Sequence, residues 1–573
     1  MCNGRENWAM ERDPQDEDEQ VSDNESSNHD EQVEPVSLPG GTRVHVLVQV
    51  NDDDIDQGRH ADDEPPVVFF PYPPYVDMQR DCFDGFAVKP WTEEATGNDD
   101  AIVAEIRYHG TRRYLYNAVK NVLKRAHASK TAKAGHWNLF WGRHLESSQY
   151  TALLPGQKVN HFPGSLELGR KDRLCSNILR MQRKFGTFFQ IIPETYVTGG
   201  KDGKPLMTAM SANPKSLWIL KPPNQCCGRG IKLVAGGSDY KYEPDKRYVA
   251  QKYIMNPYLI NGYKFDMRLY VLVLPQVTSF DPLRVYLFDN GLVRFCTQKY
   301  STAKKDLKNR FGHLTNYSVN KKNKAFQSNQ DAADDGAGSK WSYQALQAYF
   351  KTHGVDPDKI HADIALVISK TLMCVESPIV ASLNSFKNVR QFDSCFELYG
   401  FDILLDATLR PWLLEVNVFP SMSSSSPMDK RIKSILVCDT FQLVGLPAVD
   451  MSQVHESHTK SRKERTLGLT KKLSTSTIQN EDASLGARWT LALEGETARQ
   501  GHFRRIFPTE DTADHLPFFE KPRDGNLFYA KYIRNAKSNS KPLMSTTKPA
   551  AVVRRASFSD KLNQAKRTSL SYG

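Results

Sequence analysis

The sequence predicts an α+β protein, because strand-like and helix-like segments share the region from about residue 101 to 447. Short apolar runs such as WILK and LYVLVL are separated by turn residues, as expected for strands. Elsewhere apolar residues recur at helical spacing, as at Leu174, Ile178, Met181 and Phe185. No uninterrupted run of 18 apolar residues occurs, so we expect the helices to pack on sheets and no membrane to be involved.

The expected elements follow from these patterns in order. Tryptophan, tyrosine and branched residues mark the strands, and Asp289-Asn290-Gly291 is typical of a hairpin turn between two of them. The expected strands are Phe188 to Ile192, Leu217 to Leu220, Ile231 to Val234, Tyr248 to Tyr253, Arg268 to Leu274, Arg284 to Phe288 and Leu292 to Phe295, and the expected later helices are Trp341 to His353, Asp358 to Met373 and Asp429 to Leu443.

Charge divides the chain further. Residues 1–64 hold 4 Lys and Arg against 19 Asp and Glu, which predicts a disordered acidic leader. We expect a linker rich in proline and aromatics over 65–100, an N-terminal α/β subdomain over 101–190, a central subdomain over 191–275 and a C-terminal one over 276–447. Residues 451–573 hold 22 basic against 12 acidic side chains, so 448–573 is predicted to be a basic, largely disordered tail. The basic regions favour an acidic partner.

Three oxygen ligands lie on one expected hairpin, FELYGFDILLD followed by RPWLLEVN. Cross-strand pairing brings Asp402 near Glu415, and the period of two places Asn417 on the face of Glu415. Two carboxylates and an amide suit Mg²⁺ shared with a nucleotide. A hairpin whose polar residues merely cap its end is the alternative.

A lysine and a glycine turn follow the strand WILK. Lys221 ends that strand, and Gly228, Arg229, Gly230 and Ile231 follow it, so backbone N–H groups and a cation could meet phosphates. A plain hairpin turn is the alternative, and the pattern is not a Walker A loop. The strand end formed by Gln251, Lys252, Tyr253 and Ile254 could offer backbone groups to an adenine edge, or be only a strand.

Charged residues alternate along the next strand, where Lys264, Asp266 and Arg268 share one face. They would grip phosphates or a carboxylate, or form a solvated edge. Arg294 and the stretch HLTN, with Thr315 and Asn316, add polar groups downstream. The ordered combination describes an ATP-grasp site, in which two α+β subdomains hold ATP between their sheets.

These stretches resemble the tubulin tyrosine ligase-like family from about Lys158 to Leu446. NHFPGS with RKDRL, and HLTNYSVNKKN, are most similar to its polyglutamylase branch, and particularly to the member that adds the first glutamate of a glutamate side chain on tubulin. The resemblance implies an ATP-grasp-like ligase core using ATP and Mg²⁺, with Asp402, Glu415 and Asn417 as metal ligands and Lys221, Arg268 and Glu415 as catalytic residues. It implies nucleotide and substrate binding by Lys221, Gly228, Arg229, Gly230, Ile231, Gln251, Lys252, Tyr253, Ile254, Lys264, Asp266, Arg268, Arg294, Thr315 and Asn316.

The implied activity is ATP-dependent ligation of free L-glutamate to glutamates in acidic tubulin tails on microtubules, with other acidic proteins as further substrates. Arg170, Lys171, Arg173 and the basic tail are the candidates for capturing such an acceptor. We expect a monomer in the cytoplasm, on the cytoskeleton, and at the cilium or basal body. A glycine or tyrosine ligase and a catalytically silent microtubule-binding protein are the alternatives. No recognised module supports nucleic-acid binding, and nine cysteines without zinc spacing fit a reducing compartment.

Overall fold

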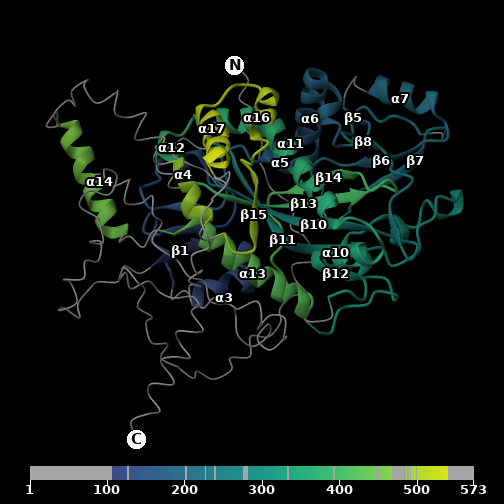
Figure 1. The fold of residues 1–573 in the computed structure, drawn as a ribbon, viewed down its shortest axis with the longest axis horizontal. Coiled ribbons are helices and arrows are strands. Elements are labelled where there is room, and N and C mark those ends of the chain that lie inside the picture. Colours follow the sequence, from purple (N-terminus) through teal and green to yellow (C-terminus); the bar gives the residue numbers. More distant parts are fainter. Residues whose placement is uncertain are drawn as a thin grey trace, which may run out of the picture.

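The computed structural model of the chain describes residues 106–539, apart from 126–127, 200–202, 226–227, 238–239, 275–281, 332–334, 392–393, 447–450, 468–485, 487–488, 491 and 498–499. The predicted acidic leader and the predicted linker lie outside these residues. Within them, helices and sheets intermingle along the chain, so the mixed α+β class is confirmed (Figure 1).

The first sheet is small and parallel, with the order β2-β1-β3-β4. Its strands are β1 (Arg107–Gly110), β2 (Ser129–Lys130), β3 (Leu139–Trp141) and β4 (Lys158–Val159). The helices that follow β1 and the later strands are α3 (Asn117–Arg125), α4 (Ser147–Thr151), α5 (Leu166–Gly169) and α6 (Lys171–Phe185). The backbone N–H of Val159 donates to the carbonyl of Ser394 at 2.6 Å, which ties this sheet to the central one.

The second sheet is antiparallel, with the order β5-β8-β6-β7. Its strands are β5 (Thr195–Val197), β6 (Leu217–Lys221), β7 (Lys232–Ala235) and β8 (Val249–Lys252), and α7 (Gly203–Ala212) accompanies it. Leu206 and Met210 of the helix pack with Trp218, Leu220 and Tyr248 in a core of their own. This sheet therefore carries the predicted lysine strand and the predicted adenine strand side by side.

The third and largest sheet has the order β12-β11-β10-β13-β14, with β9 on β10 and β15 on β11. The strands are β9 (Leu259–Ile260), β10 (Tyr263–Leu274), β11 (Arg284–Phe295), β12 (Lys340–Ser342), β13 (Glu397–Leu405), β14 (Pro411–Asn417) and β15 (Phe503–Phe507). Alternate residues of β10 enter different cores, as the period of two requires. Leu269 and Val271 pack with α6 and α11, whereas Tyr270 and Leu272 pack with α3 and α13.

Three helices begin at well-defined caps. They are α10 (Tyr343–Thr352), α11 (Pro357–Leu383) and α13 (Pro427–Val444), capped by the side chains of Ser342, Asp356 and Ser426. Among the described residues, α11 is long and apolar enough by composition to cross a membrane, but 67% of its apolar window is buried inside the protein. This burial is typical of a core helix.

The predicted hairpin turn at Asp289-Asn290-Gly291 is wrong, because β11 continues through it. Leu269 pairs with Gly291 and Val271 pairs with Leu287, so the intervening residues form a bulge opposite β10. The Asn290 side chain accepts hydrogen bonds from the N–H groups of Gly291 at 2.8 Å and Tyr343 at 3.1 Å. A Cβ on Gly291 would lie 2.6 Å from the Arg268 carbonyl, so glycine serves a close approach rather than a turn.

The predicted strand from Phe188 to Ile192 is also wrong. Gly186–Phe189 form a 3₁₀ turn that ends α6, and the nearby strand is β5. Phe188 stacks on Phe518 with ring centroids 3.7 Å apart. The apolar run therefore fills a contact with the C-terminal segment instead of pairing in a sheet.

The prediction of a largely disordered tail is wrong for residues 500–539. There β15 pairs with β11, joining Val285 to Phe507 and Phe288 to Phe503, and α17 (Asp524–Asn539) follows. The Arg523 side chain donates to Glu376 on α11 at 2.5 Å. Few apolar residues of this segment contact the rest of the protein. Its polar composition therefore gave no sign in the sequence that it packs on β11 and α11. The helix α14 (Met451–Thr466) lies earlier in the predicted tail (Figure 1).

Candidate active site

A cleft lies between the second and third sheets. Both sheets, α6 and the segment 313–316 contribute to its walls. Its lining includes fourteen of the residues that the sequence singles out: Lys221, Gly228, Arg229, Ile231, Gln251, Lys252, Tyr253, Ile254, Lys264, Asp266, Thr315, Asn316, Asp402 and Glu415. Gly230, Arg268, Arg294 and Asn417 lie outside the lining.

Lys221 reaches into the cleft from the end of β6. Its Nζ donates to Gln251 Oε1 at 2.7 Å and to the Leu414 carbonyl at 3.3 Å, so it connects the two sheets. Burial lowers the pKa of Lys221 to about 8, although the charge of Glu415 opposes this. The side chain of Gln251 is itself held by Thr195, since its Nε2 donates to Thr195 Oγ1 at 3.1 Å.

The glycine turn needs a glycine at both Gly228 and Gly230. Gly228 and Gly230 have φ of 72° and 66°, a conformation that favours glycine. A Cβ on Gly230 would lie 2.5 Å from Gln225 Oε1, and one on Gly228 would lie 3.0 Å from Asn316 Oδ1. Arg310 Nη2 donates to the Gly228 carbonyl at 2.8 Å and thereby anchors the turn to the third sheet's side of the cleft.

The predicted adenine strand end is only partly available for hydrogen bonding. The N–H of Lys252 donates to the Glu194 carbonyl at 2.8 Å, and that of Tyr253 donates to the Leu217 carbonyl at 2.7 Å. The backbone hydrogen bonds of the described residues include none from the Ile254 N–H. Ile254 is therefore the residue of this segment whose N–H can meet a base.

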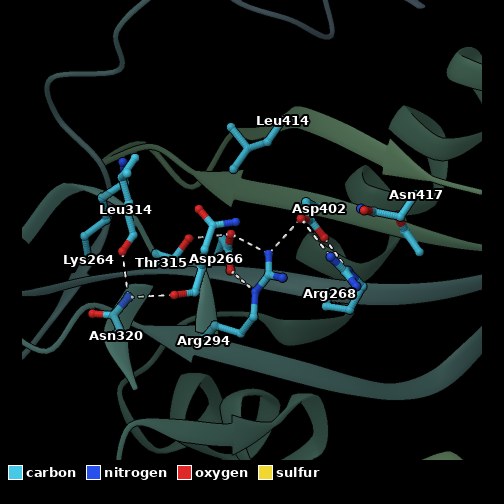
Figure 2. Close-up of polar contacts among 12 residues, drawn as sticks. Lys264, Asp266, Arg268, Arg294, Leu314, Thr315, Asn320, Asp402, Leu414 and Asn417 are labelled. Atoms are coloured by element: carbon cyan, nitrogen blue, oxygen red, sulfur yellow. Dashed lines mark hydrogen bonds and ion pairs between the residues drawn. The ribbon is translucent and has the colours of Figure 1, made fainter. Parts of the chain in front are cut away.

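Under the cleft, two arginines and two aspartates alternate in a buried row (Figure 2). Arg294 donates to both oxygens of Asp266 at 2.7 Å and to Asp402 Oδ2 at 2.8 Å. Arg268 grips Asp402 from the other side, at 2.5 and 3.1 Å. Although burial opposes ionisation, these guanidinium groups hold the pKa of Asp402 well below its usual range. Asp402 is therefore a carboxylate.

The predicted carboxylate pair is confirmed as a geometric arrangement. Asp402 pairs directly with Glu415, and Gly400 pairs with Asn417, with a bulge after Asp402. The Asn417 amide donates to the Gly400 carbonyl at 3.3 Å and lies beyond Asp402 along β14 (Figure 2). The two carboxylates thus face the cleft, while the amide sits behind them.

Lys171 is the main cleft residue whose role the sequence did not reveal. We expected it on an exposed capture surface, but its Nζ lies 3.0 Å from Glu415 Oε2 and 3.0 Å from the Gln225 carbonyl. It therefore links the metal-type carboxylate to the glycine turn. Its neighbours are also engaged, since Arg170 pairs with Asp172 and Arg173 pairs with Glu167. Pro193, Leu314, Leu404 and Leu414 line the cleft without any polar signal.

The comparison with protein families gives one decisive match. The tubulin-tyrosine ligase family matches residues 147–454 of the chain, which include the whole cleft. The chain belongs to the tubulin-tyrosine ligase family. The resemblance seen in its motifs is thereby confirmed.

Several relatives are named for glutamylation of tubulin. The chain is 37% identical over 449 residues to human tubulin monoglutamylase TTLL4, which covers 73% of this chain and 36% of that protein. It is 37% identical over 446 residues to mouse tubulin polyglutamylase TTLL5, covering 71% and 33%. Against tubulin polyglutamylase ttll-4 of Caenorhabditis elegans the identity is 36% over 401 residues, covering 66% and 64%. The chain spans about a third of the length of the two mammalian relatives.

Proposed function

We propose that the chain is an ATP-dependent tubulin polyglutamylase, which joins free L-glutamate to the γ-carboxylates of glutamates in acidic tubulin tails. The observation that carries the proposal is the meeting of Lys221, the glycine turn and the pair Asp402 and Glu415 in one cleft. Relatives named as tubulin glutamylases support the choice of substrate. The site of action would be microtubules in the cytoplasm and at the cilium or basal body, with the enzyme as a monomer.

The cleft's cations and backbone groups suit a nucleotide. Lys221 and Lys264 would neutralise phosphate oxygens, while the turn from Gly228 to Ile231 would approach them with backbone N–H groups. The Ile254 N–H would meet the adenine edge beside Gln251, Lys252 and Tyr253. Thr315 and Asn316 would complete the ribose and phosphate end of the pocket.

The donor set fits Mg²⁺, since Asp402 and Glu415 face the same space and Asn417 follows on the same strand. Asp402, Glu415 and Asn417 would hold Mg²⁺, which would supply positive charge against the negative charge that develops during phosphoryl transfer. Arg268 and Arg294 hold Asp402 ionised and in place. Lys171 holds Glu415, so both carboxylates are oriented before any ion arrives.

The reaction proceeds in two steps. A γ-carboxylate oxygen of the acceptor glutamate attacks the γ-phosphorus of ATP, the bond to the β,γ-bridging oxygen breaks, and ADP leaves. The α-amine of free glutamate then attacks the acyl phosphate carbon, forming the isopeptide bond, while inorganic phosphate leaves and the amine proton passes to solvent. Lys221 and Lys264 would supply preorganised positive charge for both steps, and Arg268 would act on the reaction through Asp402, which it holds in place.

Capture of the acidic acceptor falls mainly to α14 in this proposal. Lys460, Arg462 and Lys463 are exposed on that helix, whereas Arg170 and Arg173 already pair with acidic neighbours. Reversing these three charges to glutamate should raise the KM for microtubules and weaken its salt dependence. ATP binding in the absence of microtubules should stay unchanged.

The decisive experiment offers tubulin, ATP and Mg²⁺ with labelled glutamate, glycine and tyrosine side by side, and reads the tails by mass spectrometry. Glutamate linked to γ-carboxylates supports the proposal, and the length of the added chains separates initiation from elongation. Incorporation of glycine or tyrosine instead would identify the corresponding ligase. Microtubule binding without any incorporation would identify a catalytically silent protein.

The variant that tests the metal assignment is Glu415→Gln, which keeps the side chain's shape but removes its negative charge. Glu415 is partly exposed, with 23% of its side-chain surface accessible, so the fold should persist. Ligation should be lost. Full activity of this variant would contradict the metal assignment.

A further inference from the structure

A buried chain of hydrogen bonds runs behind the cleft from Lys264 to the segment 306–313. Lys264 Nζ donates to Tyr253 OH at 2.9 Å and to the His313 carbonyl at 3.0 Å. Tyr253 OH lies 2.9 Å from His313 Nδ1, and His313 Nε2 lies 3.2 Å from the Asp306 carbonyl. Lys264, Tyr253 and His313 also line the cleft, so this chain borders the nucleotide space directly.

The partners determine which atom donates in each bond. A backbone carbonyl only accepts, so His313 Nε2 must carry a proton towards Asp306. In a neutral imidazole Nδ1 then has no proton and accepts from Tyr253 OH. Because the phenol gives its proton to His313, its lone pairs are left to accept from Lys264. The chain therefore has one direction, from Lys264 through Tyr253 and His313 to Asp306.

The surroundings of His313 favour the neutral ring. The ring is buried and meets Tyr253 and Tyr300 edge-on, at centroid distances of 5.8 and 5.5 Å. The charged groups that act on it are Lys264 of β10 and Asp306 of its own segment. Burial lowers the pKa of His313, and the charge of Lys264 lowers it further, whereas Asp306 opposes them.

The positioning of Lys264 depends on this direction. Nζ also lies 4.6 Å from the centroid of the Tyr253 ring, so the ammonium is held by the hydroxyl, the ring and one carbonyl. Lys264 is 7% exposed, and an ammonium so far from water needs all of these contacts. Protonating His313 would make Nδ1 a donor, and it would then compete with Lys264 for the same phenol oxygen.

We infer that His313 is a positioning residue that, through Tyr253, orients Lys264 towards the nucleotide, and that its protonation weakens nucleotide binding. The inference rests on the proposed function, because it assumes that Lys264 meets ATP. It goes beyond that function by assigning a role to a histidine that contacts neither the carboxylate pair nor the glycine turn.

Binding of ATP with Mg²⁺ to the full chain, measured by calorimetry from pH 5.5 to 8, tests the inference. His313→Leu removes the acceptor for Tyr253 and should raise the Kd for ATP on the order of tenfold, the worth of one hydrogen bond in a charged network. Tyr253→Phe should weaken binding similarly. The double variant should bind no worse than either single one, because both break the same chain.

His313→Asn separates positioning from simple loss of structure. Its Oδ1 can still accept from Tyr253 but cannot be protonated, so binding at neutral pH should match the native chain. Its affinity should also lack the decline that we expect for the native chain as pH falls below the ordinary range of histidine. Since both proteins meet the same ATP, titration of the nucleotide cancels in the comparison.

The outcomes are distinct. Native affinity in His313→Leu, or an unchanged acid decline in His313→Asn, would overturn the inference while leaving the proposed function intact. A native chain that does not bind ATP would overturn both. His361→Gln is the matched control, because His361 is half-buried and contacts Tyr343 OH at 3.4 Å away from the cleft. It should leave ATP binding and its pH dependence unchanged.

Discussion

Two buried carboxyl groups on the same strand, β13, live in opposite electrostatic surroundings. Asp402 and Glu397 lie five residues apart, so they project to opposite faces. Asp402 meets two guanidinium groups, and its pKa is held well below the usual range. Glu397 accepts from His161 Nδ1 at 2.8 Å, and from the Phe162 N–H and Tyr399 OH at 3.0 Å. Burial raises the pKa of Glu397 to about 7.

The Glu397 cluster resembles a metal site more closely than the Asp402 cluster does. Possible ligand atoms of His144, His161 and Glu397 all lie within 4.8 Å of one another. However, His161 Nε2 faces the Asn160 amide at 3.1 Å, and His144 Nε2 faces Ser165 Oγ at 2.5 Å. The polar atoms are committed to one another, so the cluster joins the first sheet to β13. Convergence of ligand-type residues is therefore not sufficient; a carboxyl group that stays ionised is also needed.

The largest expected effect comes from removing the charge of Asp402. Asp402→Asn should lower glutamate incorporation roughly a thousandfold, because it removes a metal-type carboxylate and the charge that pairs with Arg268, while Arg294 keeps only Asp266. The measurement is incorporation per folded enzyme, with the melting temperature as a control. If the variant kept more than about a tenth of the native rate, Asp402 would not be a catalytic carboxylate, and it would not differ from Glu397 in role.

Glu397→Ala should affect stability instead of chemistry. It leaves the donors of His161, Phe162 and Tyr399 buried without an acceptor, which should cost about 3 kcal/mol of unfolding free energy. Urea unfolding measures that loss. Activity per folded molecule should stay within about twofold, and a large selective loss of activity would place Glu397 in the catalytic machinery after all.

The charge of Lys221 should make nucleotide use depend on pH. Its pKa is lowered to about 8 by burial, so the free enzyme loses this cation as pH rises above that value. The kcat/KM for ATP should fall about tenfold per pH unit above pH 8. Lys221→Arg stays charged at high pH. Its kcat/KM for ATP should therefore not fall above pH 8, whatever its value at neutral pH. If kcat/KM for ATP fell equally in that variant, the pH dependence would come from a group other than Lys221.

The smallest effect distinguishes the two carboxyls by the sign of their pH dependence. A carboxyl with a raised pKa binds protons more tightly when folded, so its contribution is full below its unfolded pKa and is lost as pH rises towards 7. Relative to Glu397→Gln, the native chain should therefore lose on the order of 2 kcal/mol of stability between pH 4.5 and 7. The depressed pKa of Asp402 acts oppositely, since its contribution is lost as pH falls below the usual range. Equal slopes in native chain and variant would contradict the neutral state of Glu397.

Whether a contact could be predicted from the sequence depended on how far apart its two residues lie along the chain. Asp402 and Glu415 lie on neighbouring strands of one hairpin, so period two and a short turn were enough to bring them together. Lys171 meets Glu415 across more than two hundred residues, and α6 presented only an ordinary basic face in the sequence. His313 was noticed only as part of a motif, because its partner Tyr253 lies on a different element.

Local sequence preferences failed where a segment makes contacts with residues far away in the chain. Asn290 and Gly291 are typical of a turn, yet nine residues of β10 pair with β11 on either side of the bulge and outweigh that preference. The run at Phe188 reads as a strand, but ring stacking on Phe518 holds it as a turn. The C-terminal residues read as polar tail, although Phe503 and Phe507 are enough to complete a sheet edge.

By itself the sequence determined the α+β class, the hairpin that carries Asp402, Glu415 and Asn417, and the family, because local periodicity and short motifs encode these. Only the tertiary structure decided which charges are used within the protein and which face the cleft. It placed Lys171 against Glu415, left the Ile254 N–H without a backbone acceptor among the described residues, and kept Asp402 ionised while burial disfavours charge on Glu397. The physical reason is that burial and distant partners set protonation and hydrogen bonding, and neither is a property of neighbouring residues in the chain.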